Sequence, residues 1–159
     1  MKKLLAVALT LVLALGLVAC GGQEEAEAPD LQTYYDDFMA SLGEENAPMM
    51  MDITDDMIES VYPGLGSYEL KQGVFKTAAI SAVAFEMALV EVSDEADVEA
   101  VKGIFQSRID GQIAGGAMYP ATVEAWQSAQ VLANGNVVAL ICAGEQQTAA
   151  VDAFNALFK

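Results

Sequence analysis

The amino-acid sequence predicts an α+β fold class, in which an antiparallel sheet of about four strands packs against helices. Apolar residues recur at helical spacing in some blocks and at strand-like spacing in others, and these blocks do not alternate as regular β–α–β units. Asn134-Gly135 separates two apolar runs, which is a strong signal for a β-hairpin. About 129 residues follow Asp30, enough for one domain with its own core. We expect the helices to cover mainly one face of the sheet.

A basic and then apolar segment opens the chain. Met1-Lys2-Lys3 precedes a nearly unbroken apolar run over residues 4–18. As a helix this run would be about 22 Å long, shorter than the roughly 30 Å hydrocarbon core of a bilayer, so it suits a cleaved signal peptide better than a permanent span. Leu17-Val18-Ala19-Cys20 is similar to the lipobox of bacterial lipoproteins. We therefore predict a signal peptide over residues 1–19 and a diacylglyceryl lipid, with palmitate as a typical acyl chain, on Cys20. The alternative is an incidental cysteine after an ordinary signal.

Residues 20–30 are rich in glycine and glutamate and show no apolar periodicity. Such a composition cannot form a core, so we expect a flexible acidic tether with a reach of about 16–19 Å. A single folded domain is expected over residues 31–159.

The first expected helix follows the tether. Residues 31–42 carry apolar side chains at helical spacing, with Asp30 placed to cap the helix and Gly43 placed to end it. Residues 44–52 are expected to form a loop. The methionines at 49–51 are soft side chains that could bind Cu(I), although packing is the favoured interpretation.

A second short helix is expected to begin at Thr54 and to end near Tyr62-Pro63. A short strand over residues 70–75 should follow. The run 82–92 is apolar on both of its alternating faces, which is typical of a central strand that is buried on two sides.

Two glutamates interrupt that apolar run. Glu86 and Glu91 could lie near the ends of the strand, partly in contact with solvent, and we favour this interpretation. A fully buried carboxylate would instead be a candidate functional site, because charged groups are rarely buried without a partner.

The remaining elements follow the same patterns. In order, they are a long helix that begins at residues 93–97 and ends by 115–116, a turn or short helix after Tyr119-Pro120 that contains Trp126, strands over 129–133 and 137–142, and a terminal helix over 145–158.

Composition restricts the functions that the chain can have. The formal net charge is −16, and such an acidic surface repels nucleic acid and anionic lipid headgroups. The chain has no histidine, which removes Ser-His and Cys-His catalysis and histidine metal ligands. Only Cys142 remains after Cys20, so a disulfide within the domain is not expected, and Cys142 should be a small buried apolar residue.

One combination of residues resembles a known family. The strand Phe85–Val92 runs into Ser93–Lys102, and Arg108, Gln112, Tyr119-Pro120, the hairpin Asn134–Val138 and Asp152-Ala153-Phe154 follow. Together with the lipobox, this order is similar to small lipoproteins of clostridia-like Gram-positive bacteria that are grouped as domain of unknown function 4358 (DUF4358). The resemblance covers about residues 31–159 and implies a cell-envelope lipoprotein without an assigned activity.

These observations favour a lipid-anchored binding or interaction module on the outer face of the cell membrane. Its expected partners are the membrane, through Cys20, and an envelope protein, with no nucleic acid. No catalytic, cofactor-binding or metal-binding residue is assigned, and an enzyme is not expected. One alternative is a protein that binds divalent cations such as Ca²⁺ through its acidic surface, although the acids of residues 52–59 lack the spacing of an EF-hand loop. A less favoured alternative is a hydrolase of wall sugars that uses a pair of carboxylates.

Overall fold

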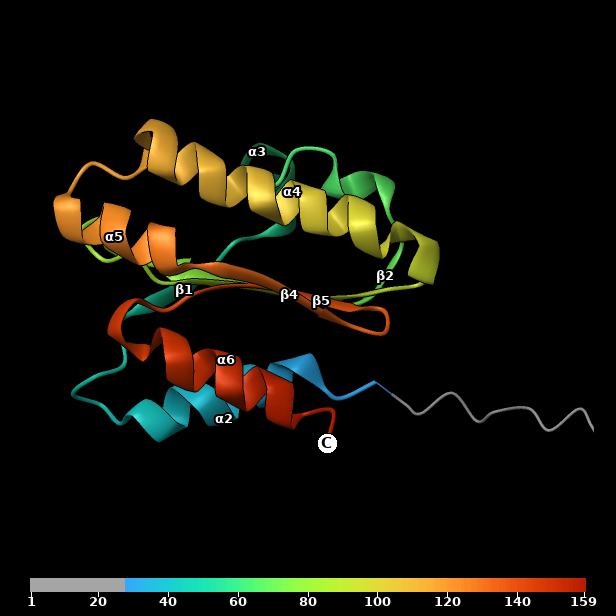
Figure 1. Cartoon of the computed structure of the whole chain (residues 1–159), viewed down its shortest axis with the longest axis horizontal. Coiled ribbons are helices and arrows are strands. Elements are labelled where there is room, and N and C mark those ends of the chain that lie inside the picture. The colour runs from blue at the N-terminus through green and yellow to red at the C-terminus, as the bar shows by residue number, and fades with distance from the viewer. Residues whose placement is uncertain (1–27) are drawn as a thin grey trace, which may run out of the picture.

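The computed structural model describes residues 28–159 (Figure 1). The predicted signal peptide, Cys20 and the tether as far as residue 27 lie outside the described residues. Within the part of the chain that is described, no helix has both the length and the apolar character needed to cross a membrane.

The described residues form five α-helices and five strands. In chain order they are α2 (Leu31–Leu42), β1 (Met50–Asp52), α3 (Asp55–Val61), β2 (Leu70–Ala78), β3 (Glu86–Val92), α4 (Val98–Gly111), α5 (Pro120–Ser128), β4 (Gln130–Asn134), β5 (Val137–Cys142) and α6 (Gln147–Ala156).

The strands form one sheet in the order β1-β2-β3-β5-β4, and every neighbouring pair is antiparallel. The predicted α+β class is therefore confirmed, with five strands where about four were expected. The additional strand is β1, which lies in the segment predicted as a loop. Met50 pairs with Ala78 and Asp52 with Lys76, so a partner far along the chain makes this three-residue segment a strand. Its own short pattern carries no strand signal.

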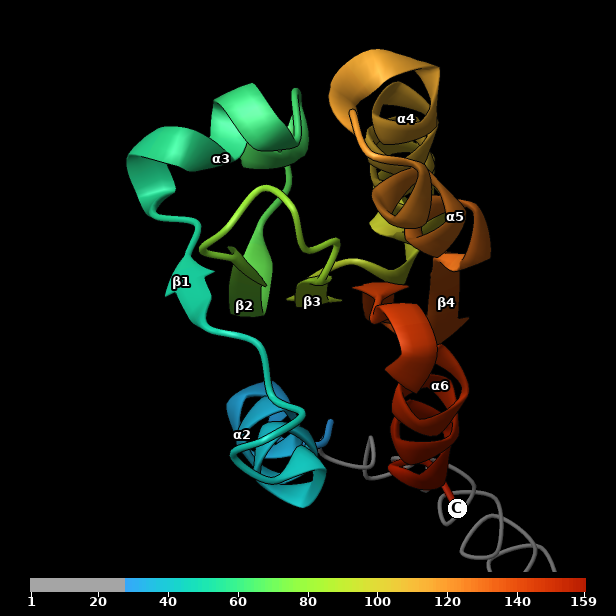
Figure 2. The same cartoon turned by 90° about the vertical axis from the view of Figure 1, so that its left-hand side faces the viewer.

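Helices cover both faces of the sheet, so the prediction that they cover mainly one face is wrong. Helices α3, α4 and α5 lie on one side and α2 and α6 on the other (Figures 1 and 2). The reason lies in the two central strands, because every residue of β3 and β5 is buried. Both faces of these strands carry apolar side chains, and each face needs a cover of its own.

The two faces have separate hydrophobic cores. Alternate residues of β3 point to opposite sides, so Ala88 and Val90 belong to the core under α4 while Met87 and Leu89 belong to the core over α2 and α6. In the second core, the Tyr34 hydroxyl of α2 donates to the Ala150 carbonyl of α6 at 2.9 Å. The tyrosines of α2 therefore serve packing.

The ends of α2 are those predicted from the sequence. The Thr33 backbone N–H donates to the Asp30 carboxylate at 2.6 Å, and the helix ends at Gly43 with φ of 71°. In α4 the apolar side chains Val98, Val101, Phe105 and Ile109 recur at helical spacing and form a buried stripe. Ile113 is 37% exposed, because it lies in a π-helical turn over residues 112–116 that follows α4.

The predicted hairpin joins β4 and β5, with a different loop from the one expected. Asn134 pairs with Val137, so the two loop residues are Gly135 and Asn136. Gly135 has φ of 54°, and no residue other than glycine has a positive φ in the described chain. A positive φ at the first loop position alone is the type II′ arrangement, whereas the type I′ turn that an Asn-Gly pair usually forms needs a positive φ at both loop positions.

Candidate functional site

Glu86 is the most deeply buried charged residue of the domain, with 1% of its surface exposed. It is the first residue of β3, and its side chain points to the face covered by α3, α4 and α5. Partial contact with solvent was therefore the wrong expectation for this residue. The strand end at which Glu86 lies is closed over by side chains from α4 and from the segment after α3, which bring hydrogen-bond donors with them.

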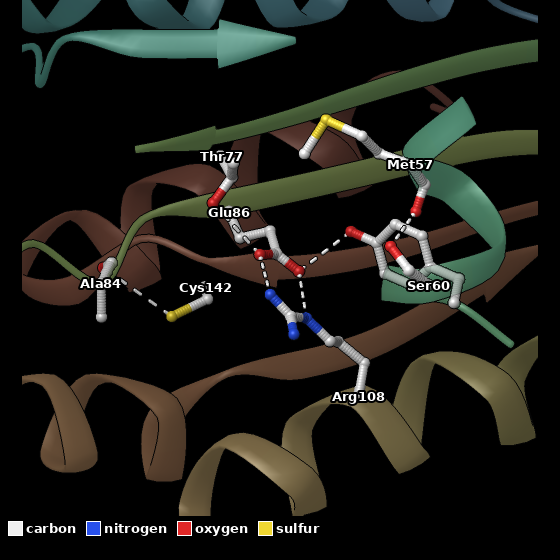
Figure 3. Close-up of polar contacts among 8 residues, drawn as sticks. Met57, Ser60, Thr77, Ala84, Glu86, Arg108 and Cys142 are labelled. Atoms are coloured by element: carbon white, nitrogen blue, oxygen red, sulfur yellow. Dashed lines mark hydrogen bonds and ion pairs between the residues drawn. The ribbon is translucent and has the colours of Figure 1, made fainter. Parts of the chain in front are cut away.

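Four hydrogen bonds satisfy the Glu86 carboxylate. Arg108 of α4 donates from Nε to Oε1 at 2.9 Å and from Nη2 to Oε2 at 2.7 Å, as Figure 3 shows. The Tyr62 hydroxyl donates to Oε1 at 2.9 Å, and Thr77 Oγ1 donates to Oε2 at 3.2 Å. These four donors compensate the charge of the buried carboxylate, so no uncompensated charge remains in the core.

Arg108 stands between this carboxylate and the outside. Its side chain is 22% exposed, and its guanidinium carbon lies 5.5 Å from the centre of the Trp126 ring. Burial by itself would lower the pKa of Arg108, but the hydrogen bonds and negative charge of Glu86 outweigh burial and raise the pKa. The guanidinium is therefore permanently charged and held on two sides.

Tyr62 is held by the apolar core around it. It ends α3 as the residue after Val61, has no exposed surface, and packs against the rings of Phe75 and Phe105 at centroid distances of 5.7 and 5.4 Å. Burial, together with the negative charge of Glu86, raises the pKa of Tyr62 well above its ordinary value. The phenol is therefore a neutral hydrogen-bond donor to Glu86.

A polar pocket of about 290 Å³ opens beside this ion pair. Its walls come from the end of β2 and the loop before β3, from the turn after α4, and from α5. Glu86 and Arg108 are the charged side chains that line it, and Gln112, Thr122 and Trp126 contribute to the wall on the α4 and α5 side. The pocket is thus an opening to solvent whose inner end carries a compensated ion pair.

Glu91 is also buried, at 6% exposed, so partial solvation was wrong for this glutamate as well. It points to the opposite face of the sheet, where Gln72 Nε2 donates to its Oε2 at 2.8 Å and Lys71 Nζ lies 3.4 Å from its Oε1. The Gln72 side chain also accepts from the Leu31 N–H at 3.0 Å and donates to the Pro29 carbonyl at 3.2 Å. Glu91 and Gln72 therefore attach the start of α2 to the sheet.

Glu86 and Glu91 do not form a carboxylate pair across a groove, because they project from opposite faces of β3. The sequence singled out both residues but not the partners of Glu86. Arg108 is the only arginine in the chain and lies directly beside Ile109 of the apolar stripe. A lone arginine at the flank of a buried stripe is the signal that could have pointed to a buried acidic partner.

Two further sequence-based expectations concern sulfur. Cys142 is fully buried on β5, and burial raises the pKa of its thiol to about 12, so it is the small apolar residue that was predicted. The methionine run is less uniform. Met50 packs on the core beside α2, whereas Met49 and Met51 are 72% and 42% exposed, so packing explains only one of the three.

No group of three or more histidine, cysteine, aspartate or glutamate side chains that could hold a metal ion occurs within residues 28–159. The acidic side chains of this region are spread over the surface or used within the ion pairs described above.

The fold and this site define a small α+β protein with a two-sided antiparallel sheet and a buried ion pair beside a pocket. The family model described as "Domain of unknown function (DUF4358)" matches residues 43–143, well over half of the chain, and the chain belongs to this family. The resemblance found in the sequence is thereby confirmed for the family. No curated protein and no solved structure matches the chain.

Proposed function

We propose that this protein is a lipid-anchored binding module on the outer face of a bacterial cell membrane, and that it holds its ligand in the pocket beside Glu86 and Arg108. The observation that carries the binding role is the position of Arg108. A half-buried guanidinium, fixed by a buried carboxylate on one side, lines an open pocket on the other. Convergent polar groups in a concave site are the usual form of a ligand-binding site. The proposed role is binding without a chemical step.

The position of the pocket supports this role for an anchored protein. The described chain enters the domain at the start of α2, which Gln72 and Glu91 hold near the hairpin end of the sheet. Glu86 lies at the other end of the same strand, about 17 Å away at the usual rise per residue. Figure 1 shows the start of α2 and helix α5 toward opposite ends of the sheet. An anchor that precedes α2 would thus leave the pocket facing away from the membrane.

The proposed anchor is the lipid on Cys20. Two acyl chains make anchoring stable, whereas a single chain binds a bilayer only reversibly. The acidic chain, with a formal charge of −16, would not add electrostatic binding to anionic headgroups or to nucleic acid. Attachment would therefore depend on the lipid alone.

Anchoring is tested with two matched cysteine substitutions in the full-length chain. Cys20→Ala should move the protein from the membrane fraction to the soluble fraction. Cys142→Ala changes the buried cysteine in the same way and should leave it in the membrane fraction. Equal retention of both variants would contradict lipid anchoring.

The binding role is tested by photo-crosslinking in intact cells. A photoreactive residue at Ser81, which is exposed and lines the pocket, should give a defined adduct. The same residue at Asn155, exposed on α6 on the opposite face, is the control and should not give that adduct. Mass spectrometry of the purified chains shows whether each variant carries an adduct and what its mass is. Identical adducts at both positions, or no adduct at either, would reject the pocket as the binding site.

A further inference from the structure

We propose that the pocket binds a small carboxylate, which takes up the free edge of the Arg108 guanidinium. This inference rests on the proposed binding role and names the chemical class of ligand. It follows from the donors that Glu86 leaves unused, from the balance of charge in the pocket, and from the size and lining of the pocket.

The guanidinium has one edge in use and one edge free. Glu86 occupies Nε and one N–H of Nη2, which is the side edge of the planar group. A guanidinium carries five N–H donors. Within residues 28–159, Nη1 and the second N–H of Nη2 have no hydrogen-bond acceptor, and Figure 3 shows Nη1 turned away from Glu86. These two groups are parallel donors, whose spacing matches the two oxygens of a carboxylate.

The negative charge of Glu86 does not fully neutralise the positive charge on the edge of the Arg108 guanidinium that faces the pocket. Tyr62 and Thr77 also donate to the Glu86 carboxylate, so three side chains share its negative charge. The guanidinium keeps positive charge on its outer edge, and Trp126 holds it in place from a ring distance of 5.5 Å. The acidic surface of the protein opposes an anion, but salt screens charges that are more than about 8 Å away at physiological ionic strength.

The size of the pocket limits the ligand to a small molecule or to the last residue of a peptide. A volume of 290 Å³ corresponds to roughly ten water molecules. The walls include the small side chains of Ala78, Ala79, Ala84 and Ala117. A carboxylate with a short apolar substituent therefore fits the lining better than a bulky or strongly hydrated anion.

Trp126 provides a direct readout, because it is the only tryptophan in the chain and contacts Arg108 at the pocket wall. The full-length chain in detergent micelles is titrated with N-acetylalanine, with the neutral N-acetylalaninamide and with inorganic phosphate, at constant ionic strength. We expect a saturable change in Trp126 fluorescence with N-acetylalanine, and at least a tenfold weaker response to the amide and to phosphate.

Three results would overturn the proposal. The first is no saturable change with N-acetylalanine. The second is an equal response to the amide, which would mean that charge is not recognised. The third is saturation by phosphate alone, which would mean that the site prefers a tetrahedral anion.

Variants identify the group responsible. The double substitution Glu86→Gln and Arg108→Gln removes both charges together and should abolish the response, whereas Glu91→Gln on the opposite face should leave it unchanged. If the double variant does not fold, the comparison of N-acetylalanine with its amide on the unmodified chain still tests whether the pocket recognises the carboxylate. A pocket adduct at Ser81 combined with no response to carboxylate would reject the ligand class but leave the binding role standing.

Discussion

At the scale of single residues, the domain depends on how Glu86 and Arg108 compensate each other. Removing a carboxylate from water is costly, and only a close partner with additional donors offsets that cost. Here the offset comes from four hydrogen bonds that originate on three side chains. Losing one charge of the pair leaves the other charge buried and unpaired, which is worse than losing both.

Glu86→Gln should therefore lower the free energy of unfolding by about 3 kcal/mol, because it leaves the half-buried guanidinium without its counter-charge. Adding Arg108→Gln should restore part of this loss, since both charges are then absent. Urea denaturation followed by circular dichroism measures both effects.

Glu91→Gln is the matched control for this prediction. Glu91 is also buried, but its cationic partner Lys71 has a side chain that is 46% exposed, so the loss should be only about 1 kcal/mol. Equal losses for the two glutamates would show that the Arg108 pair has no special role in stability.

At the scale of elements, local signals determine where helices begin and end. Asp30 and Gly43 bound α2 as the sequence predicted, because a carboxylate cap and a glycine with positive φ act through neighbouring residues alone. The strand β3 shows the opposite case. It begins at Glu86 and not near residue 82, since pairing with β2 and β5 sets its limits.

Two glycine substitutions should change stability in opposite directions. Gly43→Ala places a Cβ at φ 71° and ψ 163°, a region that only glycine adopts readily, and should cost about 1–3 kcal/mol. Gly103→Ala lies on the exposed side of α4, where a Cβ meets nothing within 4 Å, and should stabilise the domain by about 0.5–1 kcal/mol.

Thermal and urea unfolding of these two variants give the measurement. Because the same side chain is added in both, the difference between them isolates the backbone conformation. A stability loss at Gly103 as large as that at Gly43 would contradict this account.

At the scale of the whole molecule, burial of ionisable groups on both faces makes stability depend on pH. Burial raises the pKa of Cys142 to about 12 and that of Tyr35 to about 12, the latter with a contribution from neighbouring carboxylates. The folded protein therefore holds these protons more tightly than the unfolded chain. Their stabilising contribution is complete below about pH 9 and is lost as the pH rises toward 12.

The free energy of unfolding should accordingly fall between about pH 9 and pH 12. Cys142→Ala removes one of the contributing groups, so its stability should fall less steeply over the same range. Urea titrations at a series of pH values test this, and an identical slope in the two proteins would reject the contribution of the buried thiol.

The sequence by itself determined the α+β class, the limits of α2, the hairpin between β4 and β5, and the family to which the chain belongs. The class, the limits of α2 and the hairpin depend on residues that are close together in the chain, where spacing, caps and turns act directly. The family resemblance depends on the order of several such segments along the chain. Only the tertiary structure decided which faces of the sheet are covered, that β1 is a strand, and that Glu86 meets Arg108, Tyr62 and Thr77. These contacts join residues from four separate segments, and their burial follows from packing, which no local pattern encodes.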